Sequence, residues 1–268
     1  MDLKLDGKIA LVTGSSKGIG EGIAHGLARE GVVIIVHGRD KAKTEAVAHN
    51  IIAEGGRAHV VLGDLTREEE VQRLVDETKA LGAVEIVINN AGGSGETQTW
   101  ETTRPEIWAE GYDRNVLAAV RITTPLLPAM RAAKWGRIIN VSSLAGLMPP
   151  AGRPDYAAAK AAMIAMTASL AKAVALDGIT ANTVSPGTIR SISLDEAFRK
   201  AAVGQGLAPD APWSKVERQV LPLFAKVPVG RVGTLEEIAD AVVFLASPRA
   251  GYITGVNLRL DGGLWPGL

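Results

Sequence analysis

The chain has 268 residues, enough for one large α/β domain or two small ones, and equal numbers of basic and acidic residues, 29 each, leave it without net charge. It has no block of basic residues for nucleic acid or an anionic membrane, and no cysteine for disulfides, thiolate zinc sites, iron–sulfur clusters or nucleophilic catalysis. The N-terminus lacks a signal peptide's apolar core and no apolar run reaches ~18 residues, so we expect a soluble, cytoplasmic protein.

Short apolar runs alternate with helix-length stretches from the start of the chain. The predicted strands are 8–13, 32–37, 58–62, 84–89, 137–142, 180–185 and 256–260. The predicted helices are 18–30, 41–54, 67–80, 104–132, 152–177 and 234–247. Strands that are apolar on both faces and alternate with helices predict a parallel sheet covered on both sides. With right-handed connections, this pattern predicts a doubly wound α/β sheet of the Rossmann type.

Residues 191–233 interrupt this regular alternation. The segment contains four prolines, two helical pieces and isolated aromatic side chains. A long insertion in a compact domain is usually functional or disordered. We therefore expect a single domain over residues 1–268, with this segment as a helical lid.

A glycine-rich turn, Gly14-Ser15-Ser16-Lys17-Gly18-Ile19-Gly20, joins the first strand to the first helix. Its glycines let the backbone turn sharply and approach a ligand, and the helix N-terminus offers N–H groups to phosphate. In this position the turn predicts a dinucleotide site. The turn also fits the Gly-x-Ser-x-Gly elbow of hydrolases, but that motif needs a later histidine, and the last histidine of the chain is His59.

The end of the second strand bears on which nicotinamide dinucleotide binds. NAD sites place Asp or Glu there for the 2′-hydroxyl group, whereas an Arg accommodates a 2′-phosphate. The strand ends in His37-Gly38-Arg39-Asp40, and Lys17 in the glycine turn adds a second cation. These residues favour NADP(H) over NAD(H), although a shift of one residue would bring Asp40 to the ribose.

Tyr156 and Lys160 lie four residues apart at the start of a predicted helix, so the phenol and the ammonium share one face. A phenol pKa near ~10 is too high for proton transfer at neutral pH. A neighbouring ammonium and an oxidised nicotinamide both lower this pKa, and the pair could then act as a general acid/base on a carbonyl or alcohol oxygen. Alone, however, this spacing is common in helices and is more often structural than catalytic.

Several motifs in register make the chain resemble a short-chain dehydrogenase/reductase from about residue 6 to residue 263. They are Thr13-Gly14-Ser15-Ser16-Lys17-Gly18-Ile19-Gly20, Asp64-Leu65, Asn89-Asn90-Ala91-Gly92, Asn115, Ser143, Tyr156 with Lys160, and Ser185-Pro186-Gly187. Asn115 and Ser143 stand at that family's distances from Tyr156. The resemblance implies an NADP(H)-dependent oxidoreductase that transfers hydride between the cofactor and a CH–OH or C=O group.

The resemblance also implies a role for each matched residue. Tyr156 would protonate the substrate carbonyl or accept the proton in oxidation, while Lys160 would lower the pKa of Tyr156 and bind the nicotinamide ribose. Ser143 would polarise the substrate oxygen, with Ser142 as the other candidate. Asn115 would kink its helix and hold a water. The implied cofactor contacts are Gly14, Ser16, Lys17, Gly18, Ile19, Gly20, Arg39, Asp64, Leu65, Asn90, Ala91, Gly92, Tyr156, Lys160, Pro186, Gly187, Ile189 and Ser191.

The lid offers two interpretations of its apolar side chains, which are Phe198, Leu207, Trp213 and Phe224, with Trp265 from the tail. They could line an apolar pocket for a medium-sized or bulky carbonyl compound, or they could only pack the lid onto the body. Gly93-Ser94-Gly95, after the fourth predicted strand, would form a flexible wall of the same cleft.

Two alternative functions stay open at this point. His37-Gly38-Arg39 resembles sugar or polyol dehydrogenases of the gluconate type, and the same fold could serve a catalytically silent, cofactor-sensing regulator. The absence of cysteine and of ligand spacing among the four histidines predicts no metal. The tail Leu260-Asp261-Gly262-Gly263 resembles members whose last strands pair across a two-fold axis, so we expect a homotetramer.

Overall fold

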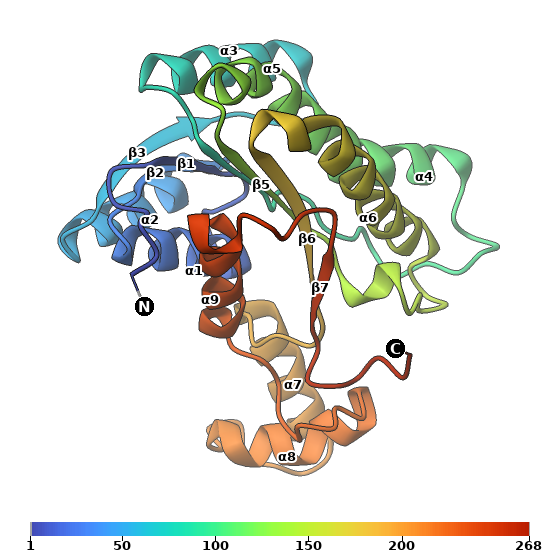
Figure 1. The fold of residues 1–268 in the computed structure, drawn as a ribbon. Helices are drawn as coiled ribbons and strands as arrows, with labels where there is room; N and C mark the ends of the chain where they lie inside the picture. The colour runs from blue at the N-terminus through green and yellow to red at the C-terminus, as the bar shows by residue number, and fades with distance from the viewer. Residues whose placement is uncertain (1, 268) are drawn as a thin grey trace.

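The computed structural model describes residues 2–267, and its centre is a sheet whose strands all run parallel (Figure 1). The strand order is β3-β2-β1-β4-β5-β6-β7, which confirms the predicted doubly wound α/β fold. The strands are β1 (Ile9–Val12), β2 (Val33–Gly38), β3 (Arg57–Leu62), β4 (Ile86–Asn89), β5 (Gly136–Val141), β6 (Ile179–Pro186) and β7 (Asn257–Leu260). Each overlaps a predicted strand, with ends that differ by one or two residues.

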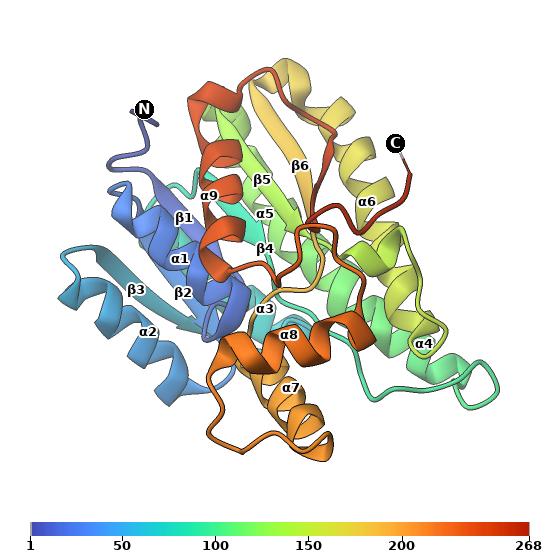
Figure 2. The same ribbon diagram turned by 90° about the horizontal axis from the view of Figure 1, so that it is seen from below.

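Helices cover both faces of the sheet (Figure 2). One face carries α1 (Gly18–Arg29), α2 (Lys41–Ala53) and α9 (Leu235–Ala246). The other face carries α3 (Glu68–Ala80), α5 (Ala118–Ala133) and α6 (Pro154–Val174). The alternation of side chains explains the two layers, since Ala10 and Val12 of β1 are buried under the first set and Leu11 under the second.

The single helix predicted at 104–132 is divided in the structure. It comprises α4 (Pro105–Tyr112), the π-helical turn η1 (Asp113–Leu117) and α5. Asn115 lies in this turn, and its Nδ2 donates a hydrogen bond of 2.8 Å to the carbonyl oxygen of Gly111. A side chain inserted into the backbone ladder is a known cause of helix distortion. The expected irregularity at Asn115 is therefore present.

Two helical stretches, 105–133 and 154–177, are long and apolar enough by composition to cross a membrane. In the fold they flank the sheet. Ile122, Leu126 and Met130 of α5 and Val174 of α6 are buried in the layer beneath them. Packing on the sheet accounts for the apolar side chains on the buried faces of both stretches.

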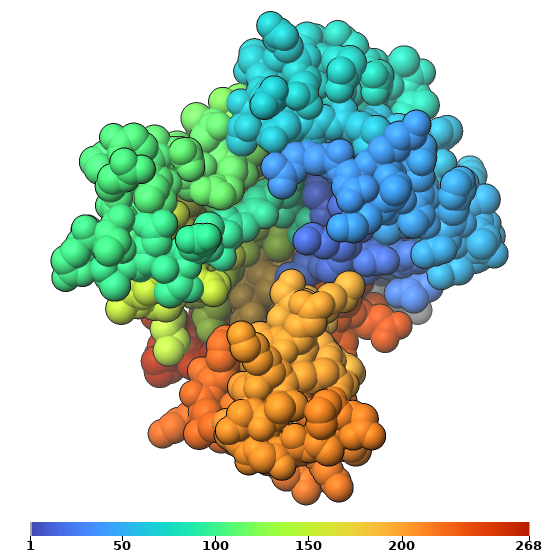
Figure 3. Space-filling view, turned by 180° about the vertical axis from the view of Figure 1, so that it is seen from behind, coloured from blue at the N-terminus to red at the C-terminus, as the bar shows by residue number. Residues whose placement is uncertain are grey.

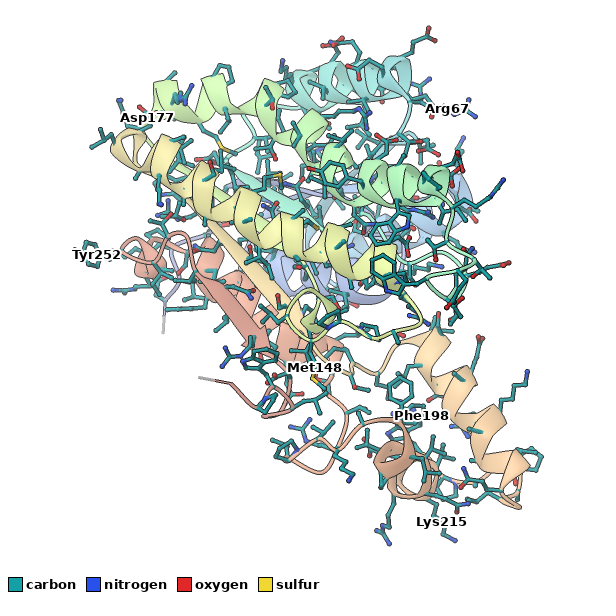
Figure 4. All side chains as sticks on the ribbon, turned by 90° about the vertical axis from the view of Figure 1, so that its right-hand side faces the viewer. Arg67, Met148, Asp177, Phe198, Lys215 and Tyr252 are labelled. Carbon is teal, nitrogen blue, oxygen red and sulfur yellow. The ribbon has the colours of Figure 1, made fainter. Side chains whose placement is uncertain are left out.

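The lid consists of α7 (Ile192–Gly204) and α8 (Trp213–Phe224), which project from the body of the molecule (Figure 1). The two helices enclose a small apolar cluster of their own, in which Phe198 is 2% exposed. Phe198, labelled in Figure 4, lies in the lid. Its ring stacks on Trp213 at 5.8 Å and meets Phe224 edge-on at 5.5 Å. Leu207 packs against the same cluster, to which Trp265 does not belong. For Phe198, Leu207 and Trp213, packing is favoured, but within the lid rather than onto the body, whereas Phe224 is 64% exposed.

Candidate active site and cofactor cleft

A cleft of about 540 Å³ crosses the carboxyl ends of β1, β2 and β4 and reaches the start of the lid. Figure 3 shows this face hollowed where the blue N-terminal segments, the green middle segments and the orange lid meet. Ligands of doubly wound sheets bind at this position, where the strand order reverses. The predicted cofactor residues in its wall are Gly14, Ser16, Lys17, Gly18, Ile19, Arg39, Asp64, Leu65, Asn90, Ala91, Gly92 and Ser191.

The glycine turn leaves open space beside the N-terminus of α1. Gly14 and Gly18 adopt φ of +63° and +62°, and a Cβ at Gly18 would meet no heavy atom within 4 Å. Lys17, at the N-cap of α1, makes no side-chain capping bond, so the first N–H groups of α1 face the cleft without a side-chain partner. Gly20 does not line the cleft, because a Cβ there would lie 2.4 Å from Nδ2 of Asn90. Gly20 instead allows α1 to pack closely against Asn90 and the glycine turn.

The side chain of His37 holds the glycine turn beside the sheet by hydrogen bonds, a role that the sequence did not predict. Its Nδ1 accepts a hydrogen bond of 3.0 Å from the N–H of Gly14, and its Nε2 lies 3.0 Å from the carbonyl oxygen of Gly63. Burial lowers the pKa of His37 to about 4. The ring is therefore neutral at pH 7, and the two contacts assign its proton to Nε2. Only the position of His37 at a strand end beside the glycine turn hinted at this.

The cations predicted for the adenosine phosphate, Lys17 and Arg39, both line the cleft. Nη1 of Arg39 lies 3.3 Å from Oδ2 of Asp64. Burial acts to raise the pKa of Asp64, but hydrogen bonds from Thr66 and Arg39 outweigh it and lower this pKa below its ordinary value. Asp40 does not line the cleft, since its carboxylate caps α2 by accepting from the N–H of Lys43.

The two candidate serines have different surroundings. Ser142 is buried, and its Oγ donates to the carbonyl oxygen of Lys160 at 2.8 Å. Ser143 begins the turn η2 (Leu144–Gly146), and its Oγ accepts from the N–H of Ala145 at 3.1 Å; it also lies near enough to the Tyr156 phenol to act on the pKa of that group, which it lowers. Ser143 is therefore the serine that reaches the phenol, as its spacing favoured.

Lys160 lies beside Tyr156 but is directed into the sheet. Its Nζ donates a hydrogen bond of 2.9 Å to the carbonyl oxygen of Val141 and lies 5.7 Å from the centroid of the Tyr156 ring. Burial lowers the pKa of Lys160 to about 8. The pKa of Tyr156 is raised, because burial outweighs the opposite effects of Ser143 and of the positive charge of Arg153. The lowering of this pKa expected from Lys160 together with an oxidised nicotinamide stays a prediction.

Asn115 hydrogen-bonds the loop that walls the cleft, and the next residue, Val116, packs on Ala159 and Met163 of the helix that carries Tyr156 and Lys160. Its Oδ1 accepts from the N–H of Gly93 at 3.0 Å, and its Nδ2 donates to the Gly93 carbonyl at 3.1 Å. A Cβ at Gly92 would lie 2.5 Å from the same Oδ1, so the loop approaches Asn115 as closely as glycine permits. Gly93 and Ser94 also line the cleft, as expected of that wall.

The segment after β6 is only partly in the cleft. Pro186, Gly187 and Ile189 are outside its wall, and Ile189 is buried in a parallel bridge with Gly233 at the base of the lid. Ser191 lines the cleft and caps α7, its Oγ accepting from the N–H of Leu194 at 3.2 Å. Arg114, which sequence reasoning did not single out, also lines the cleft. It directly precedes Asn115 in the chain, which was the available signal.

Comparison with known proteins finds relatives that are reductases or a putative dehydrogenase. The 3-oxoacyl-[acyl-carrier-protein] reductase of Vibrio cholerae is 37% identical over 264 residues, which cover 98% of this chain and 99% of that protein. The L-sorbose reductase of Gluconobacter frateurii, solved with NADPH and L-sorbose, superposes with a TM-score of 0.91 at 32% identity over 100% of both chains. A putative gluconate dehydrogenase of Agrobacterium tumefaciens superposes with a TM-score of 0.87 at 27% identity, also over 100% of both chains.

The family model described as short chain dehydrogenase matches residues 8–202. This segment holds the glycine turn, the Asn115 turn, Ser143, Tyr156 and Lys160, so the resemblance carried by these motifs is confirmed. The match and the full-length relatives show that the chain belongs to the short-chain dehydrogenase/reductase family and is an oxidoreductase that acts on carbonyl or alcohol groups.

Proposed function

We propose that this protein is an NADP(H)-dependent oxidoreductase that interconverts a ketone or aldehyde and an alcohol, with Tyr156 as general acid/base. One observation carries the proposal. The cleft is bounded by Gly93, which hydrogen-bonds Asn115 of η1, and η1 packs through Val116 on Ala159 and Met163 of α6, the helix that carries Tyr156 and Lys160. The phosphate-binding turn and the candidate proton donor thus lie on elements that pack together.

The cleft residues fit the cofactor. The N-terminus of α1 would hold the diphosphate, and Lys17 and Arg39 would bind the 2′-phosphate. Asp40 caps α2 and offers no free acid for a 2′-hydroxyl group. The L-sorbose reductase structure contains NADPH, which supports the same preference here. When bound, NADPH would supply the hydride.

The proton would come from the chain's own residues. Tyr156 is protonated at neutral pH, and Lys160 together with the nicotinamide as it becomes oxidised would lower its raised pKa, so that it could donate to a carbonyl oxygen during reduction. Ser143, close to the phenol, would polarise the same oxygen. Lys160, with a pKa of about 8, would stay mostly cationic at pH 7, stabilise the phenolate left after proton transfer and bind the nicotinamide ribose. Asn115 would hold the water from which Tyr156 is reprotonated.

The first test is a fluorescence titration of the purified protein with NADPH and, in parallel, with NADH. We expect at least about tenfold tighter binding of NADPH, since two cations would contact the 2′-phosphate. The double variant Lys17→Ala with Arg39→Ala should lose most of this preference. Tighter binding of NADH would overturn the cofactor assignment, and binding of neither would leave a silent regulator as the better hypothesis.

A second candidate, reduction of a sugar ketose or oxidation of a polyol, is favoured by the lid. Phe198 and Trp213 stack within the lid's own cluster, which leaves polar groups such as Ser94 and Ser191 in the wall of the cleft. Initial rates with NADPH should then be higher for L-sorbose and related ketoses than for an apolar 3-oxoacyl ester. A higher kcat/KM for the ester would favour the bulky-carbonyl alternative.

We further propose a homotetramer as the working assembly. Leu117 of η1 and Val120 of α5 are more than a third exposed, and β7 is an edge strand of the sheet, so both surfaces can pair across two-fold axes. Light scattering after size-exclusion chromatography should give four times the chain mass of 28.0 kDa. A monomer mass would contradict this proposal.

A further inference from the structure

Arg114 is the side chain of the cleft that the proposed function leaves without a role. It lies in the π-helical turn η1, one residue before Asn115, and it lines the cleft together with Ser94 and with Ile192 and Ser193 at the start of the lid. A Cβ at Gly95 would lie 3.8 Å from Nη2 of Arg114, so the guanidinium is directed along the loop that follows β4. Arg114 therefore lies where that loop and the lid face each other.

The charge of Arg114 is not compensated. Among residues 2–267 its guanidinium has no carboxylate within 4.0 Å and no hydrogen-bond acceptor, whereas the neighbouring Asp113 is paired with Arg121 at 2.7 Å. The wall of the cleft carries the cations Lys17, Arg39 and Arg114 and a single carboxylate, Asp64, which is paired with Arg39. An uncompensated arginine in a partly enclosed cleft is suited to an anionic ligand.

The anion can be identified from the arrangement of the walls. Lys17 and Arg39 follow β1 and β2 and lie beside Asp64 and Leu65, at the adenosine end. The first residues of α1 and Arg114 both line the cleft, and Figure 3 shows blue N-terminal and green middle segments on two sides of the hollow. The N–H groups at the start of α1 carry only partial charges, and a diphosphate beside them leaves full negative charges facing the opposite wall.

Resting on the proposed function, we propose that Arg114 is a further cofactor-binding residue, which reaches across the cleft to the diphosphate of the bound dinucleotide. A guanidinium fork can bond two phosphate oxygens at once. Its place opposite Ile192 and Ser193 means that the contact would also close the cleft between the β4 loop and the lid. The α1 N-terminus and Arg114 would thus hold the diphosphate from two sides.

The test compares Arg114→Gln with Arg104→Gln, a matched loss of one positive charge at the N-cap of α4, outside the wall of the cleft. Calorimetric titrations use two probes, NADPH and 2′-AMP, which carries the 2′-phosphate but no diphosphate. We expect Arg114→Gln to weaken NADPH binding about tenfold or more, the usual effect of losing a charge-assisted hydrogen bond, and to change 2′-AMP binding less than about twofold. Arg104→Gln should leave both affinities unchanged.

The outcomes separate this inference from the proposed function. Unchanged NADPH affinity of Arg114→Gln would overturn the inference, and so would equal losses for NADPH and 2′-AMP, which would assign Arg114 to the adenosine phosphate. Failure of the wild-type protein to bind NADPH would instead refute the proposed function. Arg114→Lys keeps the charge without the fork, and it should bind NADPH more tightly than Arg114→Gln does. The lysine variant keeps the test decisive if the glutamine variant does not fold.

Discussion

The body of the molecule has a much larger apolar core than its lid. The body buries both faces of a parallel sheet, and its central strands hold fully buried side chains such as Ile34 and Ile88. The lid encloses one small cluster between α7 and α8, and these helices pack mainly on each other. The groups assigned to proton transfer therefore lie on rigid elements, while the segment facing the substrate can vary or move without disturbing them.

The largest expected effect concerns the body's reacting group. Tyr156→Phe removes the phenolic proton but keeps the ring, and we expect turnover to fall by about 10³-fold, within the range for loss of a general acid. NADPH affinity should stay within about twofold, because the cleft wall is unchanged. Single-turnover kinetics and fluorescence titration check both statements. Retained turnover would refute the role assigned to Tyr156.

Truncation of the body's core should affect the whole molecule. Ile88 of β4 is fully buried between the helical layers, and Ile88→Ala should reduce the free energy of unfolding by about 3 kcal/mol. Because β4 leads into the Asn90–Gly92 wall, NADPH affinity should also fall. Urea unfolding followed by circular dichroism measures the first effect. A loss below about 1 kcal/mol would mean that the core relaxes around the cavity.

Acid should weaken the body through His37. Its folded pKa of about 4 lies below the ordinary value of 6.5, so between these pH values the unfolded chain binds a proton that the folded protein does not. The free energy of unfolding therefore falls as the pH drops, by about 1.6 kcal/mol between pH 6.5 and pH 5 from this residue. In His37→Gln, the fall in the free energy of unfolding over this pH range should be smaller by this amount. Equal pH dependence in urea unfolding of both proteins would contradict the prediction.

The smallest expected effect concerns the lid. Leu221 is buried in the lid cluster, and Leu221→Ala should loosen α7 against α8 with little effect on global unfolding. We expect KM for the carbonyl substrate to rise about threefold to tenfold and NADPH affinity to stay nearly constant. Steady-state kinetics and hydrogen exchange over residues 192–224 would measure this. Destabilisation as large as that of Ile88→Ala would show that the lid and the body unfold together.

Local patterns in the sequence were sufficient for the body's architecture and for its motifs. Apolar strands alternating with amphipathic stretches predicted the parallel sheet, because side-chain periodicity is a property of a few neighbouring residues. The glycine turn was found in the same way. Spacing also favoured Ser143 over Ser142, because the number of residues between each serine and Tyr156 can be read from the sequence alone.

Only the tertiary structure decided how the site residues are surrounded. His37 bonds Gly14, 23 residues away, and Lys160 bonds the carbonyl of Val141, 19 residues away. Burial raised the pKa of Tyr156, and the lid enclosed Phe198 in its own cluster. These outcomes depend on partners and on exclusion of water by distant segments, which no local pattern contains. The uncompensated charge of Arg114 in the cleft is a result of the same kind.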